Sequence, residues 1–115
     1  MNTITGYGDG YVEINKTPYS HAVLLSSDGE IQEWDIKSFD GLSATDFSQM
    51  ASLKPELIII GTGKRQRFPK PELLKTLIEA KIGFEVMDSQ AACRTYNILV
   101  GEGRQVLLAL IVEAV

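Results

Sequence analysis

A short apolar run that ends at two glycines constrains the fold of this 115-residue chain more than any other feature. Residues 57–60 are Leu-Ile-Ile-Ile, and Gly61, Thr62 and Gly63 follow directly. Because the run has no polar alternation, it predicts a strand covered on both faces, as in a parallel sheet flanked by helices. The glycines permit unusual backbone conformations and let a ligand approach the amides closely.

The loop after this predicted strand carries three cations and an aromatic residue, namely Lys64, Arg65, Arg67 and Phe68. In open α/β sheets, ligands bind in the crevice beyond the carboxyl ends of the strands. Amides and arginines there can hold a carboxylate or phosphate, and arginine and aromatic side chains often anchor protein interfaces. The alternative is a solvated cationic loop without a binding role.

The N-terminal third of the chain predicts β-structure. Residues 11–14 alternate between apolar and polar, and residues 22–25 and 31–34 have the pattern of two hairpin strands. Asp28 and Gly29 lie between them, and both tolerate the positive φ that a type I′ turn requires. We therefore expect an N-terminal β-hairpin region.

From residue 43 onward, helix and strand patterns alternate. Ser43 is a typical N-cap, and the first helix should end near Leu53 because Pro55 favours an extended Lys54. Pro71 suits the first turn of the next helix.

Gly83 should close that second helix, and Asp88 or Ser89 should cap a third. Further strands are predicted at 84–87 and 106–112. This order predicts a single α/β domain with a mostly parallel central sheet flanked by helices.

Composition narrows the classes of function. A net charge of −4 argues against nucleic-acid binding, and a single cysteine, Cys93, allows no intrachain disulfide. The N-terminus lacks the pattern of a signal peptide. The longest apolar run, residues 106–112, is shorter than the roughly 20 residues of a membrane-spanning helix. We expect a soluble cytoplasmic protein with no membrane span.

The glycine loop does not match known nucleotide-binding motifs. Gln66 stands where the dinucleotide fingerprint needs its third glycine, and Arg65 stands where a P-loop needs serine or threonine. We therefore expect no cofactor.

Candidates for catalysis or metal binding are few. Cys93 would need a positioned base such as His21 to act as a nucleophile, and the two are distant in sequence. One histidine and one cysteine do not make a typical zinc site. We expect no catalytic residues and no metal.

A second group of donors lies on the third predicted helix. Arg94 and Asn97 are three residues apart, so they share a face of that helix, which begins at the same end of the sheet as the glycine loop. Alternatively, Arg94 pairs with Asp88 or Glu85. Tyr96 is more typical of core packing.

Several segments together resemble the Mth938-like family, domain of unknown function 498, namely Pro55–Gly63, Ala92–Leu99, Gly8-x-Gly10-Tyr11 and the apolar C-terminal strand. Its relatives include mitochondrial complex I assembly factor 3 and an adipogenesis-associated protein. The resemblance implies a compact three-layer α/β domain, with the glycine loop and the Arg-Thr-Tyr-Asn helix near a shared pocket. It implies no established reaction, and the eukaryotic members act through protein partners.

Two hypotheses follow. The first is a non-enzymatic module that assists assembly of a protein complex and docks through residues 61–68. The second is a protein or enzyme that binds a small anionic metabolite through the loop amides with Arg65 and Arg94. A homodimer is compatible with either. The candidate binding residues are Gly61, Thr62, Gly63, Lys64, Arg65, Arg67, Phe68, Arg94 and Asn97.

Overall fold

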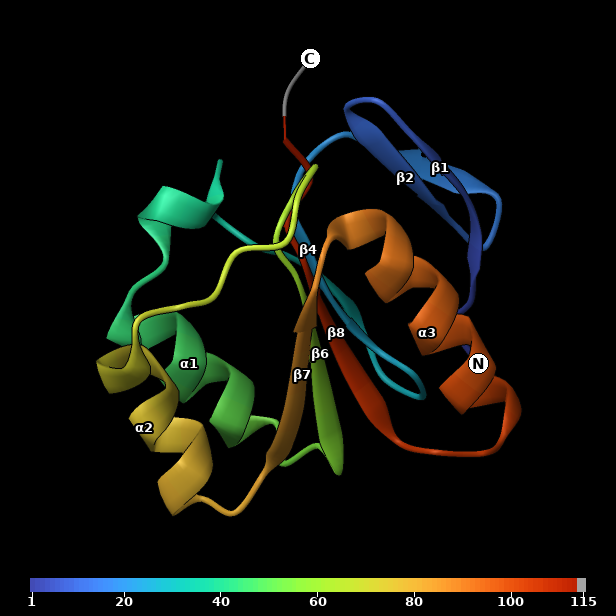
Figure 1. The fold of residues 1–115 in the computed structure, drawn as a ribbon. Helices are drawn as coiled ribbons and strands as arrows, with labels where there is room; N and C mark the ends of the chain where they lie inside the picture. The colour runs from blue at the N-terminus through green and yellow to red at the C-terminus, as the bar shows by residue number, and fades with distance from the viewer. Residues whose placement is uncertain (114–115) are drawn as a thin grey trace.

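The computed structural model describes residues 1–113, which form two β-sheets with three α-helices and one 3-10 helix (Figure 1). The larger sheet contains β4 (Val23–Ser26), β5 (Ile31–Glu33), β6 (Leu57–Gly61), β7 (Gly83–Met87) and β8 (Val106–Leu110). The smaller sheet contains β1 (Ile4–Gly8), β2 (Tyr11–Ile14) and β3 (Thr17–Tyr19). The helices are η1 (Phe39–Gly41), α1 (Ala44–Ser52), α2 (Pro71–Glu79) and α3 (Ser89–Gly101).

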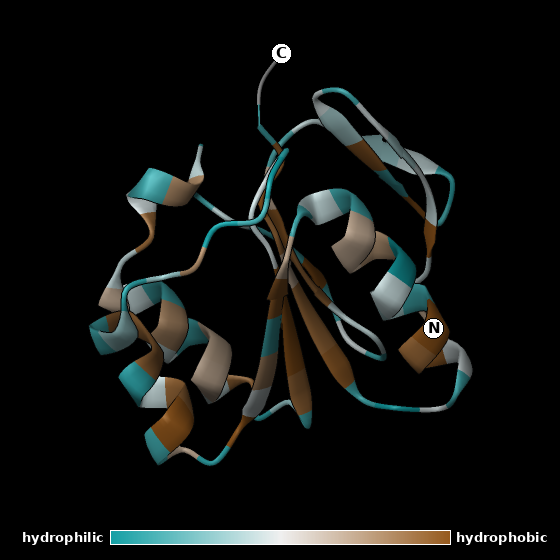
Figure 2. Cartoon of the chain, viewed as in Figure 1, coloured by the Kyte–Doolittle hydropathy of each residue, from teal (hydrophilic) through white to brown (hydrophobic). Residues whose placement is uncertain are grey.

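The larger sheet is the middle of three layers. The helices α1 and α2 lie on one face, and α3 lies on the other face with the smaller sheet beside it (Figure 1). Along β6, Leu57 and Ile59 pack toward α3, whereas Ile58 and Ile60 pack toward α1 and α2. The apolar run is therefore a strand covered on both faces, as predicted, and Figure 2 shows the hydrophobic residues along β6 and β8.

The prediction of a mostly parallel central sheet is not confirmed. The strand order is β5-β4-β8-β6-β7, in which β6 pairs in parallel with β7 and β8. The strand β4 pairs antiparallel with both β5 and β8. The alternating order of helices and strands after residue 43 produces the parallel half. The hairpin β4–β5 then extends the sheet at β8, and periodicity does not determine that long-range pairing.

The positive-φ hairpin turn lies elsewhere than predicted. The hairpin β4–β5 forms, but neither Asp28 nor Gly29 has a positive φ, so the predicted type I′ turn is wrong. Asn15 and Lys16, with φ of 50° and 68°, instead join β2 to β3. This turn and strands β1 and β3 lie in the predicted N-terminal β-region but outside its individually predicted strands. Asparagine tolerates the left-handed region, which fits its place in a primed turn.

Lysines, not glycines, close the first two helices. Lys54, predicted to be extended, has φ of 51°, and Lys81 has φ of 58°. At the end of α2, the Lys81 amide donates to the Ile78 carbonyl, and the Ile82 amide donates to the Leu77 carbonyl. This pair of bonds is a Schellman motif. The prediction that Gly83 closes this helix is therefore wrong, and Gly83 begins β7.

Candidate functional site

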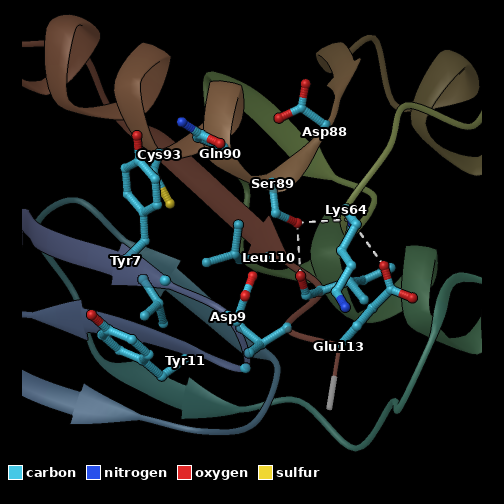
Figure 3. A pocket seen from close by; sticks show the side chains of 16 residues that line it. Tyr7, Asp9, Tyr11, Lys64, Asp88, Ser89, Gln90, Cys93, Leu110 and Glu113 are labelled. Carbon is cyan, nitrogen blue, oxygen red and sulfur yellow. Dashed lines mark hydrogen bonds between the residues drawn. The ribbon is translucent and has the colours of Figure 1, made fainter. Parts of the chain in front are cut away.

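A cavity of about 370 Å³ lies between the β1–β2 hairpin and the start of α3 (Figure 3). Its walls are residues 7–12 of the hairpin, Gly63 and Lys64 after β6, residues 88–90 with Cys93 of α3, and residues 110–113 at the end of β8. The cavity therefore lies beyond the carboxyl ends of the parallel strands β6, β7 and β8, where such a sheet usually binds its ligands.

The glycine loop is bonded to two neighbouring segments. The Gly63 amide donates to Ser89 Oγ at 2.8 Å, and the Ser89 hydroxyl donates to the Ile111 carbonyl at 2.7 Å. The Lys64 amide donates to Glu113 Oε1 at 2.7 Å. Gly63 has φ of 106°, and a Cβ there would overlap the Glu113 carboxylate. Glycine at this position is thus required by both backbone conformation and space.

Gly61 and Thr62 have structural contacts and do not line the cavity. A Cβ on Gly61 would lie 3.1 Å from both Ala92 Cβ and Ser89 Cα of α3, so the glycine lets α3 approach the sheet. The buried Thr62 hydroxyl donates to the Arg65 carbonyl at 2.7 Å and accepts from the Arg67 amide at 3.2 Å. These bonds fix the path of the loop.

The three remaining predicted residues of the loop lie outside the cavity lining. The Arg67 guanidinium donates to Asp40 Oδ1 at 2.7 Å and lies 4.4 Å from the centre of the Phe39 ring, so it is held against η1. Arg65 is exposed, and the Phe68 side chain is 71% exposed. Of the nine predicted binding residues, only Gly63 and Lys64 line the cavity.

The two donors predicted on α3 differ in their surroundings. Asn97 is bonded to the backbone of Ile4, whereas Arg94 is exposed. Among residues 1–113 the ion pairs are Arg67 with Asp40 and Arg104 with Glu56, so the alternative pairing of Arg94 with Asp88 or Glu85 does not form. The implied shared pocket does involve the glycine loop and α3. Its contributors from α3 are the first turn and Cys93.

Cys93 places a thiol at the cavity wall, and the residue is buried. Desolvation by burial raises the pKa of the Cys93 thiol to about 12, with a smaller opposing effect from Arg94. The thiol therefore stays protonated at neutral pH. His21, the base considered for it, does not line the cavity and places Nδ1 2.9 Å from the Ala22 carbonyl oxygen.

Several cavity residues lie outside the set predicted from sequence. Tyr7, Asp9 and Tyr11 come from the hairpin, and Glu113 comes from beyond β8. The motif Gly8-x-Gly10-Tyr11 did contain a usable signal, because a Cβ on Gly8 would lie 2.5 Å from the Tyr11 ring. Gly8 pairs with Tyr11 across the β1–β2 hairpin, and an aromatic side chain that covers a glycine on the neighbouring strand is a common arrangement. No local pattern points to Glu113, which is 49 residues from Lys64.

Within residues 1–113, no helix is both long and apolar enough to cross a membrane. The same residues contain no group of three or more histidine, cysteine, aspartate or glutamate side chains placed to hold a metal ion. The expectations of a cytoplasmic location, no metal and no cofactor stay predictions.

Comparison with known proteins confirms the resemblance noted in the sequence. Residues 4–111 match the family model described as "Protein of unknown function (DUF498/DUF598)". The chain is 31% identical, over 91% of its length and 86% of the relative's, to the 13 kDa major membrane protein of Francisella tularensis. It is 34% identical, over 89% of its length, to NADH dehydrogenase (ubiquinone) 1 alpha subcomplex assembly factor 3 of Bos taurus, of which it spans 55%.

Solved structures share the fold over nearly the whole chain. A crystal structure of a Bordetella parapertussis protein is 42% identical with a TM-score of 0.93, covering 98% of this chain and 97% of its own. A solution structure of a Bordetella pertussis protein, described as a Mth938-like domain, is 35% identical with a TM-score of 0.87. The coverage is 98% of this chain and 87% of that one. The fold is therefore the mixed α/β fold of Mth938-like domains.

Proposed function

Because this chain belongs to the DUF498/DUF598 family, whose relatives include a respiratory-complex assembly factor, we propose that it is a non-enzymatic module that binds a protein partner and assists assembly of a respiratory complex. The chain spans about half the length of the bovine assembly factor. We therefore propose the assembly role only for the part of the assembly factor that this chain matches.

We choose this docking surface because Phe68 is exposed in a loop whose backbone is held by hydrogen bonds. Phe68 is 71% exposed, although phenylalanine usually lies in the core. The Thr62 hydroxyl bonds to the backbone of Arg65 and Arg67, and the Gln66 side chain donates from Nε2 to the Val86 carbonyl at 3.0 Å. A pre-organised aromatic residue loses little conformational entropy when a partner binds.

The charges of this loop suggest the chemistry of the partner. Shortly before Phe68 in the sequence come three exposed residues, Lys64, Arg65 and Gln66. Arg67 forms an ion pair with Asp40, which neutralises its charge. An arginine beside an aromatic anchor suits a partner surface with an apolar pocket and a nearby carboxylate. The protonated Cys93 thiol and the lack of histidine in the cavity lining also favour a binding role over catalysis.

Affinity capture from the native host with paired variants tests this proposal. We expect Phe68→Ala and Arg65→Ala each to reduce capture of respiratory-complex subunits at least tenfold. Matched controls are Ile78→Ala, which removes a side chain that is 61% exposed on α2, and Lys75→Ala on the same helix. Equal capture by the loop variants and the controls would contradict docking through this loop.

The second hypothesis, a small anion held by the loop amides with Arg65 and Arg94, is less favoured by the geometry. Neither Arg65 nor Arg94 lines the cavity, so the two arginines of this hypothesis are not placed at the cavity wall.

A further inference from the structure

The glycine loop already binds a carboxylate, and that carboxylate belongs to the chain itself. The Lys64 amide donates to Glu113 Oε1 at 2.7 Å, and Gly63 leaves the space that the carboxylate fills. Figure 3 shows Lys64 and Glu113 together at one side of the cavity, with Tyr7 and Tyr11 on the opposite side. The loop thus binds the Glu113 carboxylate through a backbone amide, as an anion-binding loop binds a separate ligand.

Within residues 1–113, the Glu113 side chain hydrogen-bonds to the Lys64 amide and to no other group. Among the described residues of this segment, the last with backbone hydrogen bonds is Ile111, whose amide donates to the Gly61 carbonyl at 3.0 Å and whose carbonyl accepts from Ser89. Glu113 lies two residues beyond this anchor and outside β8. Its side chain can therefore leave the loop by rotation of the intervening residue, without loss of any strand pairing.

The rest of the cavity can hold the body of a molecule. Its volume of about 370 Å³ falls within the range of small-molecule sites, about 300–1,000 Å³. The wall opposite the loop carries the rings of Tyr7 and Tyr11, and Val12 and Leu110 add apolar surface. We propose that this cavity is a carboxylate-binding site, in which Glu113 occupies the position of the carboxylate of a ligand with an aromatic or other apolar body.

The charges of the cavity lining require that a ligand carboxylate replace Glu113 at the loop, because a ligand that entered beside Glu113 would add a further negative charge. The lining contains three carboxylates, of Asp9, Asp88 and Glu113, and one ammonium group, of Lys64. A ligand carboxylate that replaces Glu113 at the loop leaves the local charge nearly unchanged. A ligand that entered beside Glu113 would add a negative charge to this set, as would a phosphate dianion. The site therefore selects monocarboxylates, and Glu113 acts as a tethered competitor.

This site shares Lys64 with the proposed docking loop, but Arg65 and Phe68, the residues on which docking is tested, do not line the cavity. Failure of one proposal leaves the other standing. It also differs from an anion site built on Arg65 and Arg94, because its donors are the backbone of the loop and Lys64.

Titration of the protein with 3-phenylpropanoate, followed by the NMR signals of the Gly63 and Lys64 amides, tests the exchange. We expect Glu113→Ala to bind this acid at least tenfold more tightly than the unmodified protein, with the largest shift at Lys64. The neutral 3-phenylpropanamide and inorganic phosphate should bind at least tenfold more weakly than the acid to the same variant. Glu113→Gln keeps the side-chain size and should give an intermediate gain.

Asp9→Asn is the matched control, because it also removes one negative charge from the lining, whereas the Lys64 amide donates to Glu113 and not to Asp9. An equal gain in Asp9→Asn and Glu113→Ala would overturn the exchange, as would equal binding of acid and amide or no binding by Glu113→Ala. A second comparison measures the binding of a peptide with a free C-terminal phenylalanine against that of the same peptide with an amidated C-terminus. Preference for the free peptide assigns a chain terminus as the source of the carboxylate, and binding of the small acid alone assigns a metabolite.

Discussion

Asn97 on α3 forms two hydrogen bonds with the backbone of Ile4 on β1. Its Oδ1 accepts from the Ile4 amide at 2.9 Å, and its Nδ2 donates to the Ile4 carbonyl at 2.8 Å. The Tyr96 hydroxyl adds a bond of 2.8 Å to the Asn2 carbonyl. Together these side chains fasten the smaller sheet to α3, and that sheet supplies the hairpin wall of the cavity.

Asn97→Ala should lower the free energy of unfolding by about 2–4 kcal/mol, because it leaves two part-buried backbone groups of Ile4 without partners, at about 1–3 kcal/mol for each such group. Tyr96→Phe should cost less, about 1 kcal/mol. Urea unfolding measures both, and hydrogen exchange should show faster exchange in β1 and β2 of Asn97→Ala. A cost below that of Tyr96→Phe would contradict this role of Asn97.

Lys81→Gly should stabilise the protein by about 0.5–1 kcal/mol. Lys81 has φ of 58°, a conformation that costs a non-glycine residue about 1–2 kcal/mol, partly offset by the greater entropy of glycine in the unfolded chain. The matched change is Gly103→Ala at the same position after α3, where φ is 82° and no atom beyond the adjoining residues lies within 4 Å of the methyl group that alanine would add. It should destabilise by about 1 kcal/mol. Thermal unfolding of the two variants checks the opposite signs.

Gly61→Ala should destabilise by about 1–3 kcal/mol, because the new methyl group would lie 2.7 Å from Leu110 Cδ1 and 3.1 Å from both Ala92 Cβ and Ser89 Cα. Gly101→Ala, at the end of α3 with nothing within 4 Å, should be neutral or stabilising by up to about 1 kcal/mol. Chemical denaturation compares them, and equal effects would contradict close packing of α3 at Gly61.

Stability should fall at alkaline pH through Cys93. Burial raises the pKa of the thiol from 9.0 to about 12, so the folded state keeps a proton that the unfolded state has lost between these values. The contribution is complete below pH 9 and is lost as pH rises toward 12. Burial also raises the pKa of Tyr96, which acts in the same direction.

Cys93→Ala should therefore lose less stability than the unmodified protein between pH 9 and pH 11, each relative to its own value at pH 7. Denaturant unfolding at several pH values measures the two slopes. In the folded protein at pH 7.5, the thiol should also react with iodoacetamide far more slowly than in urea, and rapid alkylation would contradict a protonated, buried thiol.

Local patterns predicted the α1–β8 half of the fold because their signals lie within a few residues of the structure they specify. Ser43 and Asp88 precede α1 and α3 as N-caps, and Pro71 begins α2. The apolar runs of β6 and β8 became the buried centre of the sheet. The hairpin partners β4 and β5 also follow from neighbouring residues.

Prediction from sequence failed where a turn or helix end depends on packing. Lys54 and Lys81 take left-handed conformations that a lysine disfavours by itself, because the chain must reverse into β6 and β7 at these points. For the candidate site, the sequence located the glycine loop correctly at the end of β6. Seven of the nine predicted binding residues do not line the cavity, and their binding role stays a prediction.

Strand β6, its glycine loop and the helices around it follow from the amino-acid order alone, since caps, prolines and apolar periodicity act over one or two turns of chain. The folded arrangement was needed to show that β4 runs antiparallel to β8 and that Asn97 holds Ile4. It was likewise needed to show that Glu113 fills the loop at Gly63 and Lys64. These contacts join residues 49 to 93 positions apart, or whole strands, and their partners are chosen by packing of the complete core.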